Sequence, residues 1–191
     1  MNPTLILLLA FGLGVVAGLR SMTPPAIVSW AARLGWLHLE GTPLAFLAVS
    51  WVPYVLTALM LGELVADKLP GTPSRTQPGP FIGRILTGGL SGAALATGAG
   101  LSLVAGIVAG ALGAVAGTLG GYRARTGLVR ALGKPDYVVA LVEDVLAIGG
   151  AIVICLSATS TPSRIGAIDE IHSPLSMMLC VKPRTPLVSS L

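Results

Sequence analysis

The sequence predicts an all-helical membrane protein with about five spanning helices, and three observations lead to this expectation. Hydrophobic residues make up 53% of the 191 residues and charged residues only 10%, with a mean hydropathy of +0.85. A soluble domain carries about 25% charged residues. Glycine contributes 25 residues, which suits helices that pack closely in lipid. Finally, several apolar stretches approach the roughly 20 residues that a spanning helix needs.

Five apolar stretches are separated by short polar or Gly- and Pro-containing segments. They are Pro3–Leu19, Leu44–Ala66, Phe81–Gly98, Leu101–Gly120 and Tyr137–Ser157. The first stretch is followed rather than preceded by a basic residue, Arg20, so it lacks the pattern of a secretory signal. We interpret it as a retained first helix.

The chain changes character after the fifth stretch. Residues 1–157 are predicted to form one transmembrane helical domain. Residues 158–191 are rich in Ser, Thr and Pro and carry scattered charges, a composition typical of segments that do not pack into a core. We therefore expect a flexible, polar C-terminal tail.

Two shorter segments are predicted to be helical and interfacial or re-entrant. In Ala26–Leu37, apolar and polar side chains lie on opposite faces, as in helices that lie in or dip into the membrane interface. The apolar stripe consists of Ile27, Trp30, Leu34 and Leu37, and Ser29 and Arg33 lie opposite. Thr23 is the expected N-cap. The second segment is Gly127–Leu132, with Thr126 as its cap. Alternatively, Met22–Leu39 is a sixth span, although its arginine and paired prolines argue against this.

The basic residues divide unevenly between the two sides of a five-span arrangement. Seven would share the side of the N-terminus, and these are Lys68, Arg75, Arg84, Arg123, Arg125, Arg130 and Lys134. Arg20, Arg33 and the basic residues of the tail would lie on the other side. Because cytoplasmic segments carry the excess of Lys and Arg, we expect the N-terminus in the cytoplasm. The net charge of +4 has the same origin, so no binding to nucleic acid is expected.

Small residues recur every third or fourth position in three of the spans. The stripes are Ala10, Gly14 and Gly18; Gly88, Gly92, Ala96 and Gly100; and Gly106, Gly110, Gly113, Gly117 and Gly121. A helical face of small side chains lets two backbones approach closely in lipid. We expect these glycines to serve packing and not phosphate binding, because no strand–loop–helix context accompanies them.

One six-residue pattern occurs twice. Gly18-Leu19-Arg20-Ser21-Met22-Thr23 and Gly121-Tyr122-Arg123-Ala124-Arg125-Thr126 both read Gly, a bulky residue, Arg, two residues, Thr. Each follows a Gly-striped apolar stretch, and in a five-span arrangement the first and fourth spans cross in opposite directions. The pattern predicts an inverted-topology repeat, an architecture found in secondary transporters. A chance match in a biased composition is the alternative.

The repeated pattern contains the residue types of an anion site. Arg20 and Arg123 offer planar sets of N–H donors. Thr23 and Thr126 would begin helices whose free N–H groups attract anions. The alternative is that both arginines extend to phospholipid phosphates at the ends of the spans.

Two acidic pairs are predicted to lie at or inside the membrane. Glu63 and Asp67 are one helical turn apart near the end of the second span. Glu143 and Asp144 lie about two turns inside the fifth span, where an ionised carboxylate is costly unless it is paired or faces water. The candidate polar cluster consists of Glu63, Asp67, Arg84, Arg123, Glu143 and Asp144, with Arg75 on the same side. It is either a transport or binding site or a salt-bridge network that fixes the bundle.

Motifs of enzymatic chemistry do not emerge. The sequence contains no His-Glu metal motif, nucleophile elbow or phosphate-binding loop, and Cys155 and Cys180 have no metal-ligand or redox spacing. No catalytic residue, metal or cofactor is predicted, and we expect the protein not to be an enzyme. A metal-dependent lipid-modifying enzyme that uses Asp67 or Asp144 is the weaker alternative.

Three stretches resemble a known family. They are Gly18-Leu19-Arg20-Ser21-Met22-Thr23-Pro24-Pro25-Ala26, Gly62-Glu63-Leu64-Val65-Ala66-Asp67-Lys68-Leu69-Pro70 with Thr72-Pro73-Ser74-Arg75, and Arg84 with its Gly-rich span. Together they are similar to the small bacterial integral membrane proteins of domain-of-unknown-function family 4126. The resemblance covers about Met1–Ser157 and implies a multi-spanning protein of the bacterial inner membrane. It does not imply a chemistry.

We therefore expect a small membrane protein that acts as a transporter, a channel or a binder of anions or lipid phosphates. Its predicted partners are membrane lipids, a small anion or a proton or cation, and further copies of itself, because five spans enclose little interior. Arg20 and Arg123 would attract the anion, and Glu63 and Glu143 would carry the proton or cation. The alternative is a non-transporting scaffold or assembly factor whose charges serve packing alone.

Overall fold

The computed structural model describes residues 2–66, 77–132 and 136–159, all of which belong to one compact unit, Met1–Ser160. Within this part the chain is entirely helical, so the predicted fold class is confirmed at that level. Its elements are α1 (Pro3–Leu19), α2 (Thr23–Arg33), the 3-10 helix η1 (Ala45–Ala48), α3 (Val52–Ala66), α4 (Pro78–Gly98), α5 (Leu103–Leu132) and α6 (Asp136–Thr159). The expected tail, residues 158–191, lies almost wholly outside the described residues, and its flexibility stays a prediction.

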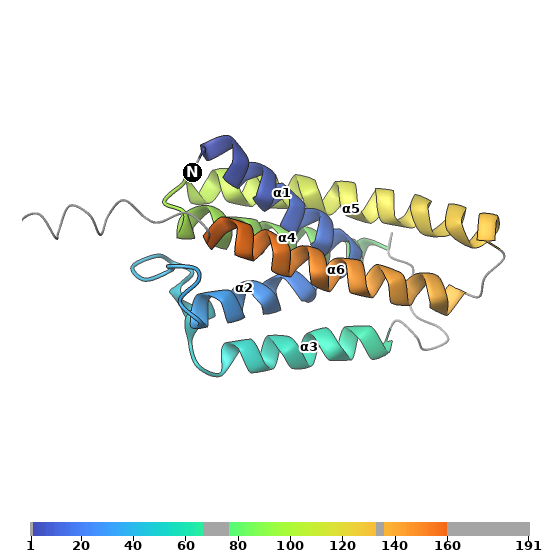
Figure 1. Cartoon of the computed structure of the whole chain (residues 1–191), viewed down its shortest axis with the longest axis horizontal. Coiled ribbons are helices and arrows are strands. Elements are labelled where there is room, and N and C mark those ends of the chain that lie inside the picture. The colour runs from blue at the N-terminus through green and yellow to red at the C-terminus, as the bar shows by residue number, and fades with distance from the viewer. Residues whose placement is uncertain (1, 67–76, 133–135, 160–191) are drawn as a thin grey trace, which may run out of the picture. The chain divides into compact units, whose positions relative to one another are not determined.

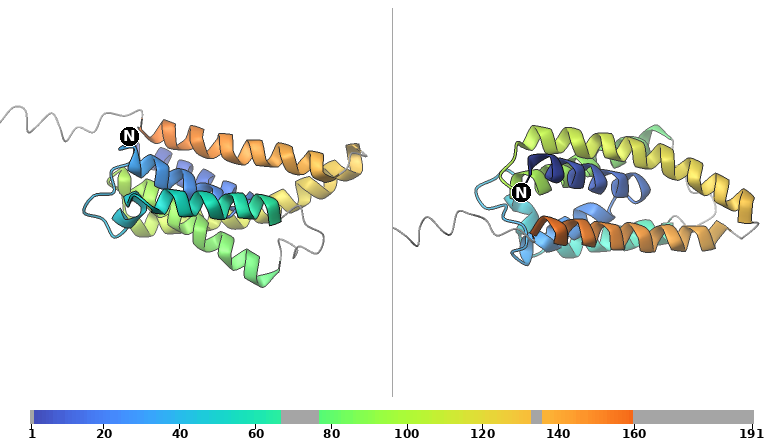
Figure 2. Two further views of the ribbon diagram at one scale, coloured as in Figure 1. Left: turned by 90° about the horizontal axis from the view of Figure 1, so that it is seen from below. Right: turned by 45° about the horizontal axis from the view of Figure 1, so that its top comes forward.

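Successive helices run in alternating directions along the bundle (Figures 1 and 2). We call the end where α1, α3 and α5 begin the N-terminal end, and the end where they finish the far end. Because α2 already turns the chain back, α3 begins at the N-terminal end, and α6 finishes there as well. The expectation that Arg20 lies on the side opposite Glu63 and Asp144 is therefore wrong.

In the part of the chain that the structure describes, two helices contain segments long and apolar enough to cross a membrane, Leu103–Ala124 in α5 and Leu141–Ala158 in α6. Helices α1 and α3 are apolar but have only 17 and 15 residues. Five spans are thus not confirmed. The second expected span is shortened because Pro53 lies in the first turn of α3. A proline inside a helix that began at Leu44 would remove a hydrogen bond and clash with the preceding turn.

Helix α2 packs into the bundle, which corrects the interfacial prediction for this segment. Its N-cap is Met22 and not Thr23, which is the first helical residue. The buried face carries Val28, Ser29 and Ala32, whereas Leu34, on the expected apolar stripe, is exposed. The Ser29 hydroxyl donates a hydrogen bond to the carbonyl oxygen of Leu47, at 2.6 Å. Small side chains of α2 thus face the other helices, and of the expected apolar stripe Leu37 is buried while Leu34 is not.

Helix α5 continues without a break through Thr126 to Leu132. The separate helix predicted for Gly127–Leu132 is therefore wrong, and Thr126 is not a cap. The physical difference lies in the prolines: Pro24 and Pro25 follow the first copy of the repeated pattern, whereas the second copy is followed by residues that keep their N–H donors.

The predicted inverted repeat is also contradicted. Helices α1 and α5, which would correspond in the two copies, run in the same direction and lie side by side (Figure 1). The contacts agree with this direction: Gly14 lies against Gly110, and Gly18, one turn later, against Ala114. Two parallel helices cannot be related by inverted topology.

The centre of the bundle consists of α1, α4 and α5 in backbone-to-backbone contact. A Cβ atom on Gly110 would overlap the carbonyl oxygen of Gly88 on α4, and one on Gly14 would overlap the carbonyl oxygen of Gly110. Gly113 and Gly117 approach the carbonyl oxygens of Phe11 and Val15 on α1 in the same way. The glycine stripes therefore serve helix packing at these contacts, as expected. The sequence did not predict that α5 would contact both α1 and α4.

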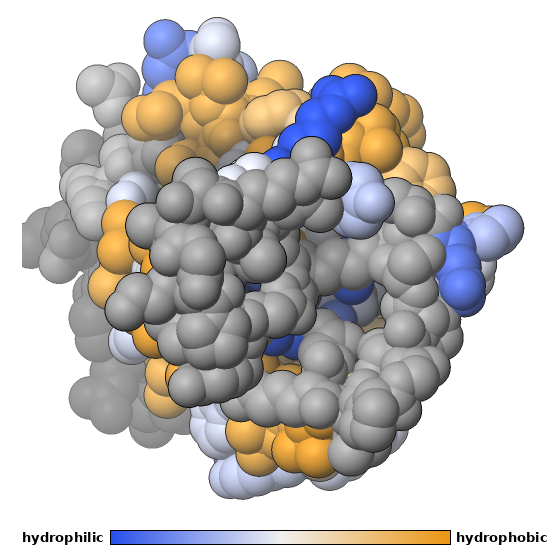
Figure 3. Space-filling model, turned by 90° about the vertical axis from the view of Figure 1, so that its right-hand side faces the viewer, coloured by the Kyte–Doolittle hydropathy of each residue, from blue (hydrophilic) through white to orange (hydrophobic). Residues whose placement is uncertain are grey.

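Large apolar side chains remain on the outside of the bundle. They include Leu8, Leu59, Leu86, Leu112, Val145 and Val153, each at least half exposed. Figure 3, which looks onto the far end, shows hydrophobic residues around its circumference. Such a surface is unusual for a soluble monomer and is typical of helices that face lipid.

We predict that Gly110→Ala destabilises the protein. Its methyl group would overlap backbone atoms of α4, and overpacking of this kind costs about 1–3 kcal/mol. Thermal unfolding of the detergent-solubilised protein measures the effect. The matched control is Gly120→Ala on the same helix, where nothing lies within 4 Å of the added carbon; it should be neutral or slightly stabilising because alanine is the better helix former. Equal stability of both variants would contradict the packing seen at Gly110.

Candidate functional site

The candidate site is built on the turn that joins α1 to α2. Helix α1 ends at Leu19, and Arg20 has an extended backbone while its N–H still bonds to the carbonyl oxygen of Val16. The chain cannot continue as one helix here, because the paired prolines of α2 suit only a first helical turn. The turn therefore places Arg20 at the far end of the bundle, between α1 and α6.

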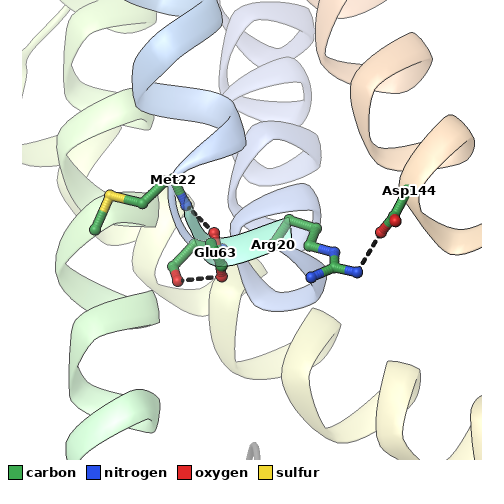
Figure 4. Close-up of polar contacts among 5 residues, drawn as sticks. Arg20, Met22, Glu63 and Asp144 are labelled. Atoms are coloured by element: carbon green, nitrogen blue, oxygen red, sulfur yellow. Dashed lines mark hydrogen bonds and ion pairs between the residues drawn. The ribbon is translucent and has the colours of Figure 1, made fainter. Parts of the chain in front are cut away.

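Arg20 forms an ion pair with Asp144 of α6, through Nη2 and Oδ1 (Figure 4). Arg20 is 1% exposed and Asp144 6% exposed. Both charges are thus removed from water, and the loss of either would leave an unbalanced buried charge. A pair of this kind is an uncommon feature in a bundle whose outer surface is largely apolar.

Glu63 of α3 holds the next two residues of the same turn. Its Oε1 accepts hydrogen bonds from the Ser21 N–H at 2.9 Å and the Ser21 hydroxyl at 2.7 Å. Its Oε2 accepts a hydrogen bond from the Met22 N–H at 2.8 Å. These donors precede the first residue of α2, so a carboxylate from another helix binds the turn just ahead of α2, and the expected side-chain cap by Thr23 is absent. Negative charge at a helix start is also favoured by the helix dipole.

Two carboxylates therefore approach one short turn from two helices. Glu63 reaches the turn from α3, and Asp144 reaches it from α6, with Arg20 extending away from Glu63 toward Asp144 (Figure 4). The arrangement ties α1, α2, α3 and α6 together at one point. Chemically, it offers a carboxylate that can accept a proton and a guanidinium that can bind an anion.

The other predicted site residues that the structure describes lie on α2, α4, α5 and α6. Thr23 is buried at the start of α2, and Arg84 is 4% exposed on α4. Arg123 is exposed on α5. Glu143 is half-buried against α5, with its Oε1 3.7 Å from the position that a Cβ on Gly121 would take.

Three predicted residues cannot be placed. Asp67 and Arg75 lie outside the described residues, and of Thr126 only the helical backbone is described. Of the predicted cluster, Glu63 and Asp144 contact the same turn, as partners of Ser21, Met22 and Arg20.

The sequence did not predict Ser21 and Met22 as site residues. A signal was present, since the N–H groups ahead of a helix that begins with Thr-Pro-Pro need an external acceptor when no side chain caps them. A buried acid elsewhere in the chain was the available acceptor. The pairing of Arg20 with Asp144 was missed because the five-span count placed the two residues on opposite sides.

The described residues contain no group of three or more His, Cys, Asp or Glu side chains that could hold a metal ion. The carboxylate oxygens of Asp144 and Glu63 instead contact N–H donors of the protein, which belong to Arg20, Ser21 and Met22.

Comparison with known proteins places the chain in a family. The model of the family described as domain of unknown function (DUF4126) matches residues 7–162, and the chain belongs to that family. No curated protein matches the sequence, and no solved structure matches it. The family resemblance drawn from the sequence is thereby confirmed.

We predict that either partner of the buried ion pair is difficult to replace alone. Arg20→Met or Asp144→Leu should each destabilise the protein by about 3–5 kcal/mol, because each leaves one buried charge uncompensated. The double variant should lose clearly less than the sum of the two, and unfolding in a denaturing detergent series measures all four proteins. Additive losses would contradict a direct coupling between the two side chains.

We also predict that Glu63→Gln destabilises the α1–α2 turn. One acceptor oxygen becomes an amide N–H₂ that faces a backbone donor, and the loss of a charge-assisted hydrogen bond costs about 1–3 kcal/mol. The matched control is Glu40→Gln, at an exposed position, which should be neutral. Thermal unfolding distinguishes the two variants. A Glu63→Gln protein as stable as the wild type would argue against the role of Glu63 in fixing the turn.

Proposed function

We propose that the protein is a small integral membrane transporter that binds a small anion at Arg20 and moves a proton on Asp144. The observation that carries the proposal is the buried Arg20–Asp144 ion pair inside a bundle with an apolar exterior. Ionised residues at membrane depth are rare and usually mark the path of an ion, a proton or a substrate.

The energetic argument supports a use beyond packing. Apolar side chains of similar volume often stabilise a protein as well as or better than a buried ion pair does. The contacts among α1, α4 and α5 are made by glycines and small side chains, which need no charges. A charge pair kept in such a place is explained when one of its members changes partners during function.

The proposed cycle exchanges two partners of one arginine. A proton binds to an oxygen of Asp144 and neutralises the carboxylate, which weakens its attraction for Arg20. The guanidinium then binds the anion through its N–H donors. Release of the anion on the other side and loss of the proton from Asp144 restore the ion pair. One proton and one anion move together, and no covalent bond of the anion changes.

Glu63 has a positioning role in this proposal. It fixes the backbone of Ser21 and Met22, so the turn stays in place while the neighbouring Arg20 exchanges partners. This assignment revises the expectation that Glu63 and Glu143 carry the proton, since Asp144 is the carboxylate in contact with the arginine. Arg84, Arg123 and Glu143 are proposed to shape the electrostatic surroundings of the site.

The surroundings of the protein are part of the proposal. The two helices that could cross a membrane support a membrane location, and the family resemblance favours the bacterial inner membrane. The narrow interior of the bundle favours a homo-oligomer, in which a second copy completes the substrate path. Membrane lipids are the other proposed partners, and no cofactor is invoked.

A structural scaffold is the second candidate function. The observation that favours it is the set of Glu63 hydrogen bonds, which together with the ion pair connect four helices at one turn. In that case the charges serve packing alone and no ion crosses the membrane. A metal-dependent lipid-modifying enzyme is less favoured, because the described residues supply no group of ligands for the metal.

The double variant Arg20→Met with Asp144→Leu separates transport from scaffolding. We expect the purified full-length protein, reconstituted in liposomes, to move phosphate, sulfate or chloride when a pH gradient is imposed. The double variant should remain folded and lose this flux at least tenfold. The exposed control Glu40→Gln should transport like the wild type.

Two outcomes would overturn the proposal: a wild-type protein that moves none of the three anions, or a double variant with undiminished flux. The charge-conserving variant Asp144→Glu provides a further measurement, because it keeps a titratable group beside Arg20. It should retain proton-dependent flux at a reduced rate, whereas a pure packing role predicts no proton-dependent flux in the wild type or in this variant.

A further inference from the structure

The aromatic residues of the chain gather at the two ends of the bundle. All three tryptophans, together with Phe46 and Tyr54, lie between residues 30 and 54, around the N-terminal end. Phe81 near the start of α4, Tyr122 in α5 and Tyr137 near the start of α6 belong to the far end. The one remaining aromatic residue, Phe11, lies within α1. Only one of the nine aromatic residues is thus found between the two ends.

The segment between α2 and α3 separates leucines from aromatic side chains. Leu37, Leu39, Leu44 and Leu47 are all buried in the core cluster. In contrast, Trp36, Phe46, Trp51 and Tyr54 are 44%, 49%, 64% and 58% exposed. The chain thus closes the N-terminal end of the bundle with its leucines and keeps its largest apolar rings outside. We call these four exposed residues the aromatic rim.

The rim also contains polar groups at the same level. Trp30 donates a hydrogen bond from Nε1 to the Thr57 hydroxyl at 3.0 Å, and its ring meets that of Tyr54 edge-on at 5.1 Å. Arg33 donates a hydrogen bond to the Ser50 hydroxyl at 2.8 Å. Rings with one apolar part and one polar part, mixed with charged groups, are typical of the boundary between hydrocarbon and water.

The distance between the two aromatic levels fits a bilayer. From Leu103 at the start of α5 to Tyr122 the helix rises about 28 Å, and from Tyr137 to Ser157 in α6 it rises about 30 Å, at 1.5 Å per residue. The hydrocarbon core of a bilayer is about 30 Å thick. Between these levels the exposed side chains are apolar, with Val108, Leu112, Val145 and Val153 among them.

We infer that the aromatic rim lies in the lipid headgroup layer and anchors the N-terminal end of the bundle in the membrane. This inference shares the membrane location with the proposed function and does not depend on transport. The occupant of the rim is the layer of phospholipid headgroups and upper acyl chains. The paired aromatic levels, their spacing and the apolar surface between them fit a lipid layer and not a local protein contact.

The charges determine which leaflet the rim occupies. The chain between α3 and α4 carries Lys68 and Arg75, and the chain from the end of α5 to α6 carries Arg123, Arg125, Arg130 and Lys134. The short connection between α4 and α5 has no Lys or Arg, and neither has the chain between α2 and α3, which follows Arg33, the last residue of α2. Since Lys and Arg are concentrated on the cytoplasmic side, the far end faces the cytoplasm and the rim lies in the outer leaflet. The orientation proposed here differs from the cytoplasmic N-terminus that the five-span count predicts.

Fluorescence quenching by brominated lipids tests the position of the rim. Full-length variants with a single tryptophan keep either Trp36 or Trp51, with the other two replaced by Phe, and are reconstituted in phosphatidylcholine vesicles. Bromine near the headgroup should quench both at least twofold more than bromine near the chain end. The control is Phe11→Trp in a protein without other tryptophans, because Phe11 is 37% exposed within α1 and should be quenched most by the deep bromine.

The outcomes distinguish the alternatives. Absence of quenching of Trp36 and Trp51 by either lipid, with normal quenching of Phe11→Trp, would show that protein or water covers the rim and would overturn the inference. Stronger quenching by the deep bromine would overturn it as well. Shallow quenching in a protein that moves no anion would leave the rim intact and contradict only the transport proposal.

Cysteine labelling tests the leaflet. In a Cys180→Ser background, where the buried Cys155 is left unchanged, His38→Cys reports the rim side and Ala124→Cys reports the far end. A membrane-impermeant maleimide added to intact cells should label His38→Cys and should label Ala124→Cys only after permeabilisation. The reverse pattern would overturn the assignment of the rim to the outer leaflet.

Discussion

The close approach of α5 to α1 and α4 is the constraint on which the rest of the structure depends. Glycines at these interfaces bring carbonyl oxygens of one helix to the Cα atoms of the next, a distance that any side chain would prevent. Thr118 adds a polar contact at the same interface, since its hydroxyl donates a hydrogen bond to Ala114 at 2.8 Å and lies 3.3 Å from the carbonyl oxygen of Gly18. In lipid, where apolar surfaces gain nothing by leaving water, contact of this kind is a main source of helix association.

The position of the candidate site follows from this packing. Because α1 is fixed along α5 as far as Gly18, the turn that begins two residues later has a fixed position as well. Arg20 extends from that turn toward α6, and Ser21 and Met22 present their N–H groups to α3. Helices α3 and α6 are therefore linked to this turn through the carboxylates of Glu63 and Asp144. The close packing of α1, α4 and α5 thus supplies the rigid support on which the polar turn is held.

The sequence predicted local structure well and long-range structure poorly. The limits of α1 agree with the expected span, and α4 and α6 agree within three residues at each end, because runs of apolar residues and flanking prolines are local signals. The prediction that Arg20 lies on the side opposite Glu63 and Asp144 was wrong, because it depended on how many times the chain crosses the bundle. Helix α2 turns the chain back with only 11 residues, which a rule based on the length of an apolar run cannot recognise. Likewise, the two copies of Gly-x-Arg-x-x-Thr differ in structure. The first forms a turn before two prolines, and the second continues a helix, so the match of six residues did not predict the local conformation.

The distribution of side-chain size explains why the same sequence carries both a dense interior and an apolar exterior. Most residues of the two candidate spanning segments are not buried in the bundle, unlike those of a core helix in a soluble protein. Many of the most buried residues of the spanning helices are small: Ala10, Ala17, Ala94 and Ala96 have no exposed surface, whereas Leu8, Leu86 and Val145 are more than 60% exposed. In water this arrangement would leave the largest apolar groups solvated and forgo the main driving force for folding. In lipid it is favourable on both sides, since small side chains allow backbone contact inside and large ones contact acyl chains outside. The buried Arg20–Asp144 pair is then the exception that a bilayer environment makes most costly, and for this reason it carries the functional proposal.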